Sequence, residues 1–388
     1  MQELSQQANK FDLSPNIHYL NGAYMSPQLK SVTRVGAESV GKKAKPYEIT
    51  GSDFFENTEL IRAEYSKLIS NPDPNRVVLI PSVSYGMATI TKNINLQNKE
   101  VVIVGEQFPS NVYPWMTATK EQGGRLIIID PPGIVEHRGN IWNEKILQAI
   151  GANTAVVALP QAHWADGTLF DLTAIRKRTL DVGALLIIDG TQTVGAYPID
   201  IDELKPDALI CAGYKWLLGP YGLGLAYYGE YFDNANPLEE NWINRLNSED
   251  FDGLVAYEES YQNGSLRFEV GEHSSFVLVP MLLEGLKQLN DWRPERIQAY
   301  CKSIVHEPIK LLKDEGFWIE DEALRTDHLF GIRHQSMPID SIKQVFAEKN
   351  IFVSYRGDAI RVAPYVHNSV NDLNVLASTL IKNIKQYA

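Results

Sequence analysis

The sequence predicts an α/β fold in which a mostly parallel, seven-stranded sheet forms a large domain and a smaller α/β C-terminal domain follows. Three observations lead to this prediction. Seven short apolar runs recur through the middle of the chain, segments with helical character alternate with them, and the composition changes after residue 229. Alternation of strands and helices is typical of doubly wound α/β domains.

The predicted strands are nearly continuous apolar runs, which is typical of strands that are buried on both faces in a parallel sheet. They are Val77–Ile80, Val101–Val104, Leu126–Ile129, Ala155–Leu159, Leu185–Ile188, Ala208–Cys211 and Leu223–Tyr227. Such sheets bind ligands beyond the carboxyl ends of their strands, so functional side chains are expected directly after these runs.

Helices are predicted between several of the strands and in the C-terminal part. They are Met87–Leu96, Asn143–Ile150, Leu172–Thr179, Val279–Asp291 and a closing helix near Val370–Tyr387, with an irregular stretch over Glu230–Asn263. The expected organisation is an N-terminal segment (1–45) that packs beside the small domain, a large domain (46–275) and a small domain (276–388).

The composition excludes several classes of protein. The chain has 388 residues and a net charge of −12, and this acidic balance argues against nonspecific binding to nucleic acid or anionic lipid. No apolar run approaches the roughly 18 residues that span a bilayer, and the N-terminus has no signal core. Two cysteines without zinc-type spacing predict a cytoplasmic protein with no metal site. A nucleotide-binding oxidoreductase would need a Gly-x-Gly-x-x-Gly loop after an early strand, and none is present.

Two consecutive strands end in residues that can carry chemistry. Asp189 ends the run Leu185–Ile188, where a carboxylate can pair with a protonated heterocyclic nitrogen; the same position also suits a metal ligand, a ribose ligand or a helix cap. Lys215 follows the next run in an apolar, glycine-containing setting. Burial lowers the pKa of a lysine and frees its amine to attack an aldehyde, although a lysine at a strand end can also reach solvent.

A third segment, Pro81-Ser82-Val83-Ser84-Tyr85-Gly86, lies between a predicted strand and a helix. Hydroxyl groups and free amides at a helix N-terminus can bind phosphate. Helix capping by Ser82 or Ser84 explains the same residues equally well.

Asp-Gly-Thr-Gln at 189–192 and Gly-Tyr-Lys-Trp-Leu-Leu-Gly-Pro at 213–220 resemble the fold type I, pyridoxal-phosphate (PLP) dependent enzymes of the class V aminotransferase family. That group includes cysteine desulfurases, kynureninases, isopenicillin N epimerase-like proteins and transaminases. The resemblance runs from Tyr19-Leu20-Asn21 to Ile360-Arg361-Val362. It implies PLP as the cofactor, a small-molecule substrate that is an amino acid or a related amine, and a homodimer with active sites shared between subunits.

The resemblance also implies roles for individual residues. Lys215 holds PLP as a Schiff base and moves the substrate α-proton, Asp189 pairs with the pyridine nitrogen, and Gln192 hydrogen-bonds the ring hydroxyl. The residues that the resemblance places around the rest of the cofactor are Ser84, Tyr85 and Tyr214 at the phosphate, Phe108 stacked on the ring, and His163 at its border. A structural role at a strand end explains His163 equally well.

Substrate contacts are expected from the C-terminal part and the opening segment. The resemblance implies that Arg361 grips the substrate α-carboxylate, which a planar guanidinium matches with two hydrogen bonds. Arg356 is a second candidate and Asn21 a third. One departure concerns Arg267–Gly271, because relatives continue with a threonine that reaches the neighbouring subunit's phosphate. Glu272 stands there and would repel phosphate, so Ser274 or Ser275 takes the contact or it is lost.

The predicted reaction is transamination, with epimerisation or a lyase reaction (isopenicillin N epimerase-like or kynureninase-like) as alternatives that begin with the same proton removal. Desulfuration needs a mobile cysteine in the C-terminal domain, but none follows Cys301, and Cys211 lies on a predicted buried strand. A PLP-fold protein that only binds is disfavoured, because Lys215, Asp189 and Arg361 are all retained.

Overall fold

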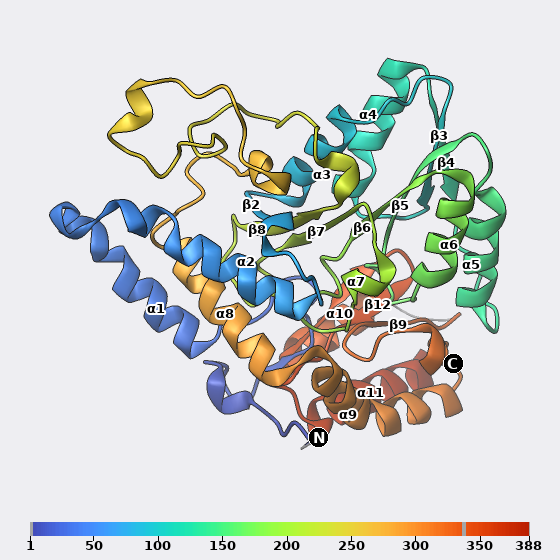
Figure 1. Cartoon of the computed structure of the whole chain (residues 1–388). Coiled ribbons are helices and arrows are strands. Elements are labelled where there is room, and N and C mark those ends of the chain that lie inside the picture. The colour runs from blue at the N-terminus through green and yellow to red at the C-terminus, as the bar shows by residue number, and fades with distance from the viewer. Residues whose placement is uncertain (1–2, 336–338, 388) are drawn as a thin grey trace.

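A sheet of seven strands occupies the centre of the structure, a computed structural model that describes residues 3–335 and 339–387 (Figure 1). The strand order is β2-β8-β7-β6-β5-β3-β4, with β8 antiparallel to both of its neighbours and the other pairs parallel. This confirms the predicted α/β fold. The strands are β2 (Val77–Ile80), β3 (Glu100–Val104), β4 (Arg125–Ile129), β5 (Thr154–Pro160), β6 (Leu185–Asp189), β7 (Ala208–Ala212) and β8 (Gly224–Tyr228).

Alternate side chains of these strands enter two separate apolar cores, as the period of a β-strand requires. In one core, strand residues such as Leu186 and Leu209 pack against helices α2, α5, α6 and α8. In the other core, Ile187 and Ile210 pack against α3 and α4. The helices on these two faces are α1 (Lys30–Val40), α2 (Glu56–Leu68), α3 (Val83–Lys92), α4 (Tyr113–Gln122), α5 (Arg138–Ala149), α6 (Leu172–Val182), α7 (Ile201–Leu204) and α8 (Leu278–Trp292).

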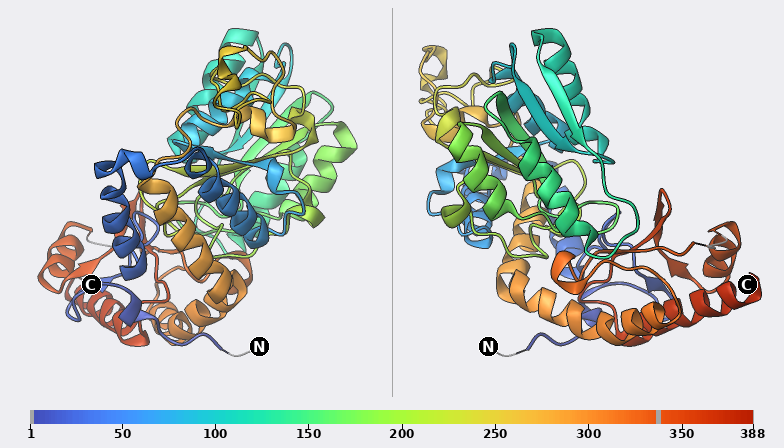
Figure 2. Two further views of the ribbon diagram at one scale, coloured as in Figure 1. Left: turned by 60° about the vertical axis from the view of Figure 1, so that its left-hand side comes forward. Right: turned by 90° about the vertical axis from the view of Figure 1, so that its right-hand side faces the viewer.

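A third apolar core lies in the C-terminal part, which the two further views show beside the sheet (Figure 2). It contains α9 (Pro294–Asp314), α10 (Ile339–Glu348), α11 (Val370–Tyr387), β9 (Phe330–Ile332), β10 (Ile351–Phe352), β11 (Ser354–Arg356) and β12 (Ala359–Val362). The N-terminal strand β1 (His18–Tyr19) pairs with β10, and Leu20 enters this core. That pairing favours the predicted packing of the N-terminal segment, while the predicted domain boundaries, whose outermost residues lie outside the described part, stay a prediction.

Two local predictions need correction. The strand β4 was expected to be buried on both faces, but it is an edge strand on which Ile128 is 50% exposed. Helix α3 begins at Val83 rather than Met87, because the Ser82 side chain accepts a hydrogen bond from the Tyr85 amide and caps the helix there.

The stretch after β8 is irregular, as predicted, and contains only short 3₁₀ helices at Glu230–Phe232, Gly253–Val255 and Gly264–Phe268. Others occur at Ala8–Lys10, Lys42–Ala44, Pro46–Glu48, Gly51–Phe54, Pro74–Arg76, Pro109–Asn111 and Glu322–Leu324. No helix within the described ranges combines the length and apolarity that crossing a membrane demands.

Candidate functional site

The carboxyl ends of the parallel strands border a cavity of about 220 Å³. Its walls come from the segments that follow β2, β3, β5, β6 and β7 and from the residues that precede the antiparallel β8. This is the edge at which α/β sheets bind ligands. The predicted site residues that line it are Ser84, Phe108, Asp189, Gln192, Tyr214 and Lys215.

Lys215 follows β7 and is only 6% exposed. Its Nζ atom lies 5.5 Å from the centroid of the Phe108 ring and 5.6 Å from that of Tyr214. Burial lowers the pKa of Lys215 to about 8, and the positive charge of Arg361 adds to this while Asp189 opposes it. A substantial fraction of the amine is therefore neutral near physiological pH, which is the form that attacks a carbonyl.

Asp189 ends β6, the strand beside β7, and is 6% exposed. One carboxylate oxygen accepts a hydrogen bond of 3.0 Å from the Thr191 amide. Burial raises the pKa of Asp189, although this hydrogen bond and the charge of Lys215 act in the opposite direction. A buried carboxylate with so few partners is suited to a cationic N–H group in the cavity.

The remaining cavity walls offer hydroxyl, amide and aromatic groups. Ser84 lies in the first turn of α3 with its hydroxyl 3.0 Å from that of Ser82, and both line the cavity at the helix N-terminus. Gln192 also lines the cavity, and its side-chain carbonyl accepts from the Trp216 indole while its amide donates to the Ala23 carbonyl.

Tyr85 and His163 are not among the cavity-lining residues. The Tyr85 hydroxyl lies within hydrogen-bonding reach of Glu239, and burial, followed by the negative charge of that carboxylate, raises the pKa of Tyr85. His163 is fully buried, with its ring against Trp142 at a centroid distance of 5.0 Å and its Nδ1 atom 3.4 Å from Asp166. The structural explanation of His163 therefore fits its position, and the predicted cofactor contacts of both residues stay a prediction.

Arg361 and Asn21 meet beside the cavity through Ser354. The Ser354 hydroxyl donates to Asn21 at 2.7 Å and accepts from Arg361 Nη2 at 3.2 Å. Arg361 is 1% exposed, and its Nη1 atom donates to the Trp164 carbonyl at 3.0 Å. Burial, followed by the charge of Arg356, lowers the pKa of Arg361 to about 9, so the guanidinium remains charged at neutral pH.

The segment that carries Glu272 lies apart from the cavity. Glu272 is exposed and adopts a left-handed backbone conformation with φ of 57°, whereas Ser274 is largely buried. The Ser275 hydroxyl accepts a hydrogen bond from the Leu278 amide at the start of α8. None of the three lines the cavity, so their predicted contact with a neighbouring subunit stays a prediction.

Among the cavity residues that the sequence analysis assigns no role are Trp164, Thr191 and Tyr221. Trp164 follows β5, donates from its indole to the Glu106 carbonyl at 2.6 Å, and packs edge-on against Phe108 at 5.5 Å. The rule that sites follow strand ends covers Trp164 and Thr191, because both lie within four residues of a strand end. The sequence favours His163, the neighbour of Trp164, for a place beside the cofactor.

Comparison with known proteins is consistent with this geometry. The family described as Aminotransferase class-V matches residues 37–378. An uncharacterized aminotransferase of Bacillus subtilis, YcbU, is 24% identical over 364 residues, which are 89% of this chain and 93% of that protein. A cysteine desulfurase of Synechococcus elongatus is 24% identical over 217 residues, or 55% of this chain and 33% of that protein.

Solved structures share the whole fold at low sequence identity. The cysteine desulfurase CsdA of Escherichia coli superposes with a TM-score of 0.80 at 16% identity, covering 98% of each chain. The cystine C-S lyase C-DES, in complex with cysteine persulfide, superposes with a TM-score of 0.83 at 18% identity, covering 95% of this chain and 98% of that one. At these identities the likeness shows the fold alone.

Proposed function

Because the chain belongs to the class V aminotransferase family, whose enzymes depend on PLP, we propose that it is an aminotransferase that moves the amino group of an amino acid to a 2-oxo acid. The observation that carries this proposal is one cavity that holds Lys215, with a pKa lowered to about 8, together with the buried Asp189. The predicted homodimer and cytoplasmic location are part of the proposal.

The residues around the cavity fit PLP. Asp189 offers a buried carboxylate to the pyridine nitrogen, and Ser82 and Ser84 offer hydroxyls and helix-terminal amides to the phosphate. Phe108 supplies an aromatic face beside Lys215. PLP, when bound, supplies an aldehyde that condenses with amines and a ring that accepts the electron pair left when a substrate Cα–H bond breaks.

The chain's own residues perform the other tasks. Lys215 would hold PLP through its Nζ atom, and the same atom, when it carries no cofactor, would act as the base that takes the proton from the substrate Cα. Asp189 keeps the proton on the pyridine nitrogen by its negative charge. Arg361 binds the α-carboxylate and fixes the substrate's orientation, while the closely packed indole of Trp164 limits the access of water from that side.

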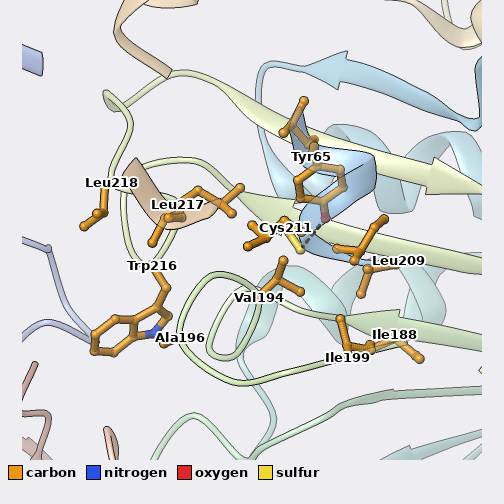
Figure 3. Packing of buried hydrophobic residues seen from close by; sticks show 14 of the residues in the cluster. Tyr65, Ile188, Val194, Ala196, Ile199, Leu209, Cys211, Trp216, Leu217 and Leu218 are labelled. Carbon is orange, nitrogen blue, oxygen red and sulfur yellow. Dashed lines mark hydrogen bonds between the residues drawn. The ribbon is translucent and has the colours of Figure 1, made fainter. Parts of the chain in front are cut away.

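Cysteine desulfuration does not suit the two cysteines of this chain. Cys211 lies on β7 inside the apolar core, where it accepts a hydrogen bond of 3.1 Å from the Tyr65 hydroxyl (Figure 3). Cys301 is fully buried on α9. Burial raises the pKa of both thiols, which suppresses the nucleophilic thiolate that attacks substrate sulfur.

The experiment that tests the proposal follows the absorbance of the PLP-loaded protein during addition of single L-amino acids. Transamination predicts loss of the visible cofactor band, formation of the corresponding 2-oxo acid, and return of the band when a second 2-oxo acid is added. Racemised amino acid would support epimerisation, and released ammonia with an intact visible band would support a lyase reaction. Either result without 2-oxo acid exchange would overturn the proposal.

A further inference from the structure

The hairpin of β11 and β12 places two arginines on one of its faces. Ser354 pairs with Arg361 and Arg356 pairs with Ala359 across the antiparallel strands. Because residues two apart on a strand share a face, Arg356 and Arg361 are diagonal neighbours on the same side of the hairpin. Gly357, with φ of 55°, permits the tight turn between the strands that fixes this register.

Both arginines lie against a single tryptophan of the cavity wall, although neither arginine lines the cavity itself. The guanidinium carbon of Arg356 lies 5.1 Å from the centroid of the Trp164 ring, and that of Arg361 lies 5.8 Å from it. Trp164 itself lines the cavity together with Lys215. The two guanidinium groups are therefore one side chain away from the cavity, and they are near enough to Lys215 for both charges to lower its pKa.

Neither arginine has a carboxylate partner within 4.0 Å among residues 3–335 and 339–387. Asp358, which follows Arg356 closely in the chain, instead accepts from Arg333 at 2.8 Å. Arg356 donates to the Tyr355 carbonyl, and the Nε atoms of Arg356 and Arg361 are buried without a hydrogen-bond partner.

Two uncompensated cations against one ring repel one another, and the burial of Arg361 removes much of the water that would screen its charge. The charge of Arg356 is the second cause, after burial, that lowers the pKa of Arg361. Bound anionic groups would relieve both costs. A single carboxylate neutralises only one positive charge, so this arrangement favours a ligand with two acidic groups.

We propose that the substrate is an amino acid with a second acidic group, whose α-carboxylate binds Arg361 and whose side-chain acid binds Arg356. This assignment of the substrate class rests on the proposed aminotransferase function. Arg361 takes the α-carboxylate because it is 1% exposed and hydrogen-bonded to the Trp164 carbonyl, on the inner side of the site. Arg356 is less buried and suits the distal acid.

Binding of unreactive acids to the PLP-loaded protein tests the two-acid site directly. Isothermal titration calorimetry is expected to show that succinate and glutarate bind roughly 10- to 100-fold more tightly than butyrate and valerate. One additional hydrogen-bonded ion pair between ligand and protein strengthens binding by about this factor. The variant R356Q is expected to reduce this ratio to within a few-fold of one. R34Q, at an exposed arginine that pairs with Glu38, is the matched control and is expected to keep the ratio.

Several results would overturn the assignment. One is equal affinity for mono- and dicarboxylates in the unaltered protein, and another is an unchanged ratio in folded R356Q. If R356Q weakens both classes equally, the two arginines grip one carboxylate and the assignment is wrong. Should R356Q not fold, R356K is the second variant, because it replaces the planar guanidinium group by a compact ammonium group. R356K is expected to reduce the preference for dicarboxylates but not to remove it, and an unchanged preference would count against the proposal.

Amino-acid reactivity separates this inference from the proposed function. Aspartate or glutamate is expected to discharge the visible PLP band at least about 10-fold faster than asparagine or glutamine at equal concentration. If the neutral amides react equally fast, the substrate class is wrong but the aminotransferase function stands. If no amino acid changes the spectrum while dicarboxylates bind selectively, the function is wrong but the two-acid site stands.

Discussion

The Nζ atom of Lys215 lies 5.5 Å from the centroid of the Phe108 ring. The amine that would hold the cofactor is therefore next to an aromatic side chain and is largely shielded from bulk water. Lys215 follows β7 and Phe108 follows β3, and these strands are not neighbours in the sheet. Their side chains meet only because the carboxyl ends of both strands open into the same cavity. This environment has a measurable consequence for the reactivity of the lysine.

The rate at which the PLP-free protein recaptures PLP is expected to rise with pH around a midpoint near 8. The neutral amine attacks the aldehyde, and its population grows as the pH passes upward through the lysine pKa. An ordinary lysine would place the midpoint near about 10.4. Stopped-flow absorbance across the pH range measures it, with free PLP and a lysine peptide as the control. A midpoint above about 10 would contradict the burial argument.

Removal of Lys215 is expected to abolish covalent retention of PLP. In K215A, borohydride treatment should leave no cofactor attached after denaturation, whereas the unaltered protein should keep it in a single labelled peptide that contains Lys215. Amino-acid turnover should fall by about 10² to 10⁴, the usual contribution of a positioned proton-transfer group. K177A, at a helix residue outside the cavity, is the control. Retention of labelled PLP in K215A would show that another lysine holds the cofactor.

Replacement of Asp189 by asparagine is expected to slow turnover by about 10² to 10³ while leaving the fold and the attachment of PLP intact. Asparagine keeps the shape of the side chain but removes the negative charge that holds a proton on the pyridine nitrogen. Single-turnover absorbance measures the loss, and D200N at an exposed helix cap is the control. Unchanged turnover in D189N would argue against the assigned role.

The sequence predicts the sheet and the two residues at the ends of β6 and β7, because buried strands have an apolar pattern that other segments lack. It does not predict side-chain direction after a strand end. Tyr85 turns toward Glu239 and His163 toward Trp142, whereas Trp164, next to His163, lines the cavity. These directions depend on where α3 begins and on long-range packing.

The shared face of Arg356 and Arg361 could not be obtained from their spacing of five residues alone. Within one continuous strand, that odd spacing would place the two side chains on opposite faces. The turn at Gly357 reverses the chain between them and restores a common face. Hairpin register therefore decides the geometry, and it is set by tertiary structure as much as by the local sequence.

Substitution of the cysteines is expected to affect stability but not the reaction. C301A and C211A each remove a buried thiol and should destabilise the fold by about 0.5–3 kcal/mol, which chemical denaturation measures. Neither variant should change amino-acid turnover more than a few-fold, and the unaltered protein should release no sulfur from cysteine. Formation of sulfide from cysteine by the unaltered protein, if lost in one cysteine variant, would instead support a cysteine desulfurase.

Glu269 gives the fold a predictable dependence on acid. Its carboxylate accepts from Arg62 at 2.7 Å and from the Leu79 amide at 3.0 Å, and it lies 3.2 Å from His273 Nδ1. Burial opposes ionisation, but the charge of Arg62 and the contact with His273 prevail and lower the pKa of Glu269 to about 2, from an ordinary 4.5.

Because the folded pKa lies below the unfolded value, the ionised Glu269 contributes its full stability above pH 4.5 and loses it progressively as the pH falls toward 2. The shift corresponds to about 3 kcal/mol. E269Q, which leaves Arg62 buried without its partner, is expected to be less stable by about 3–5 kcal/mol at pH 7. Urea denaturation of both proteins should show this difference shrinking with acidification below pH 4.5, while a difference that does not depend on pH would assign the loss to packing rather than to charge.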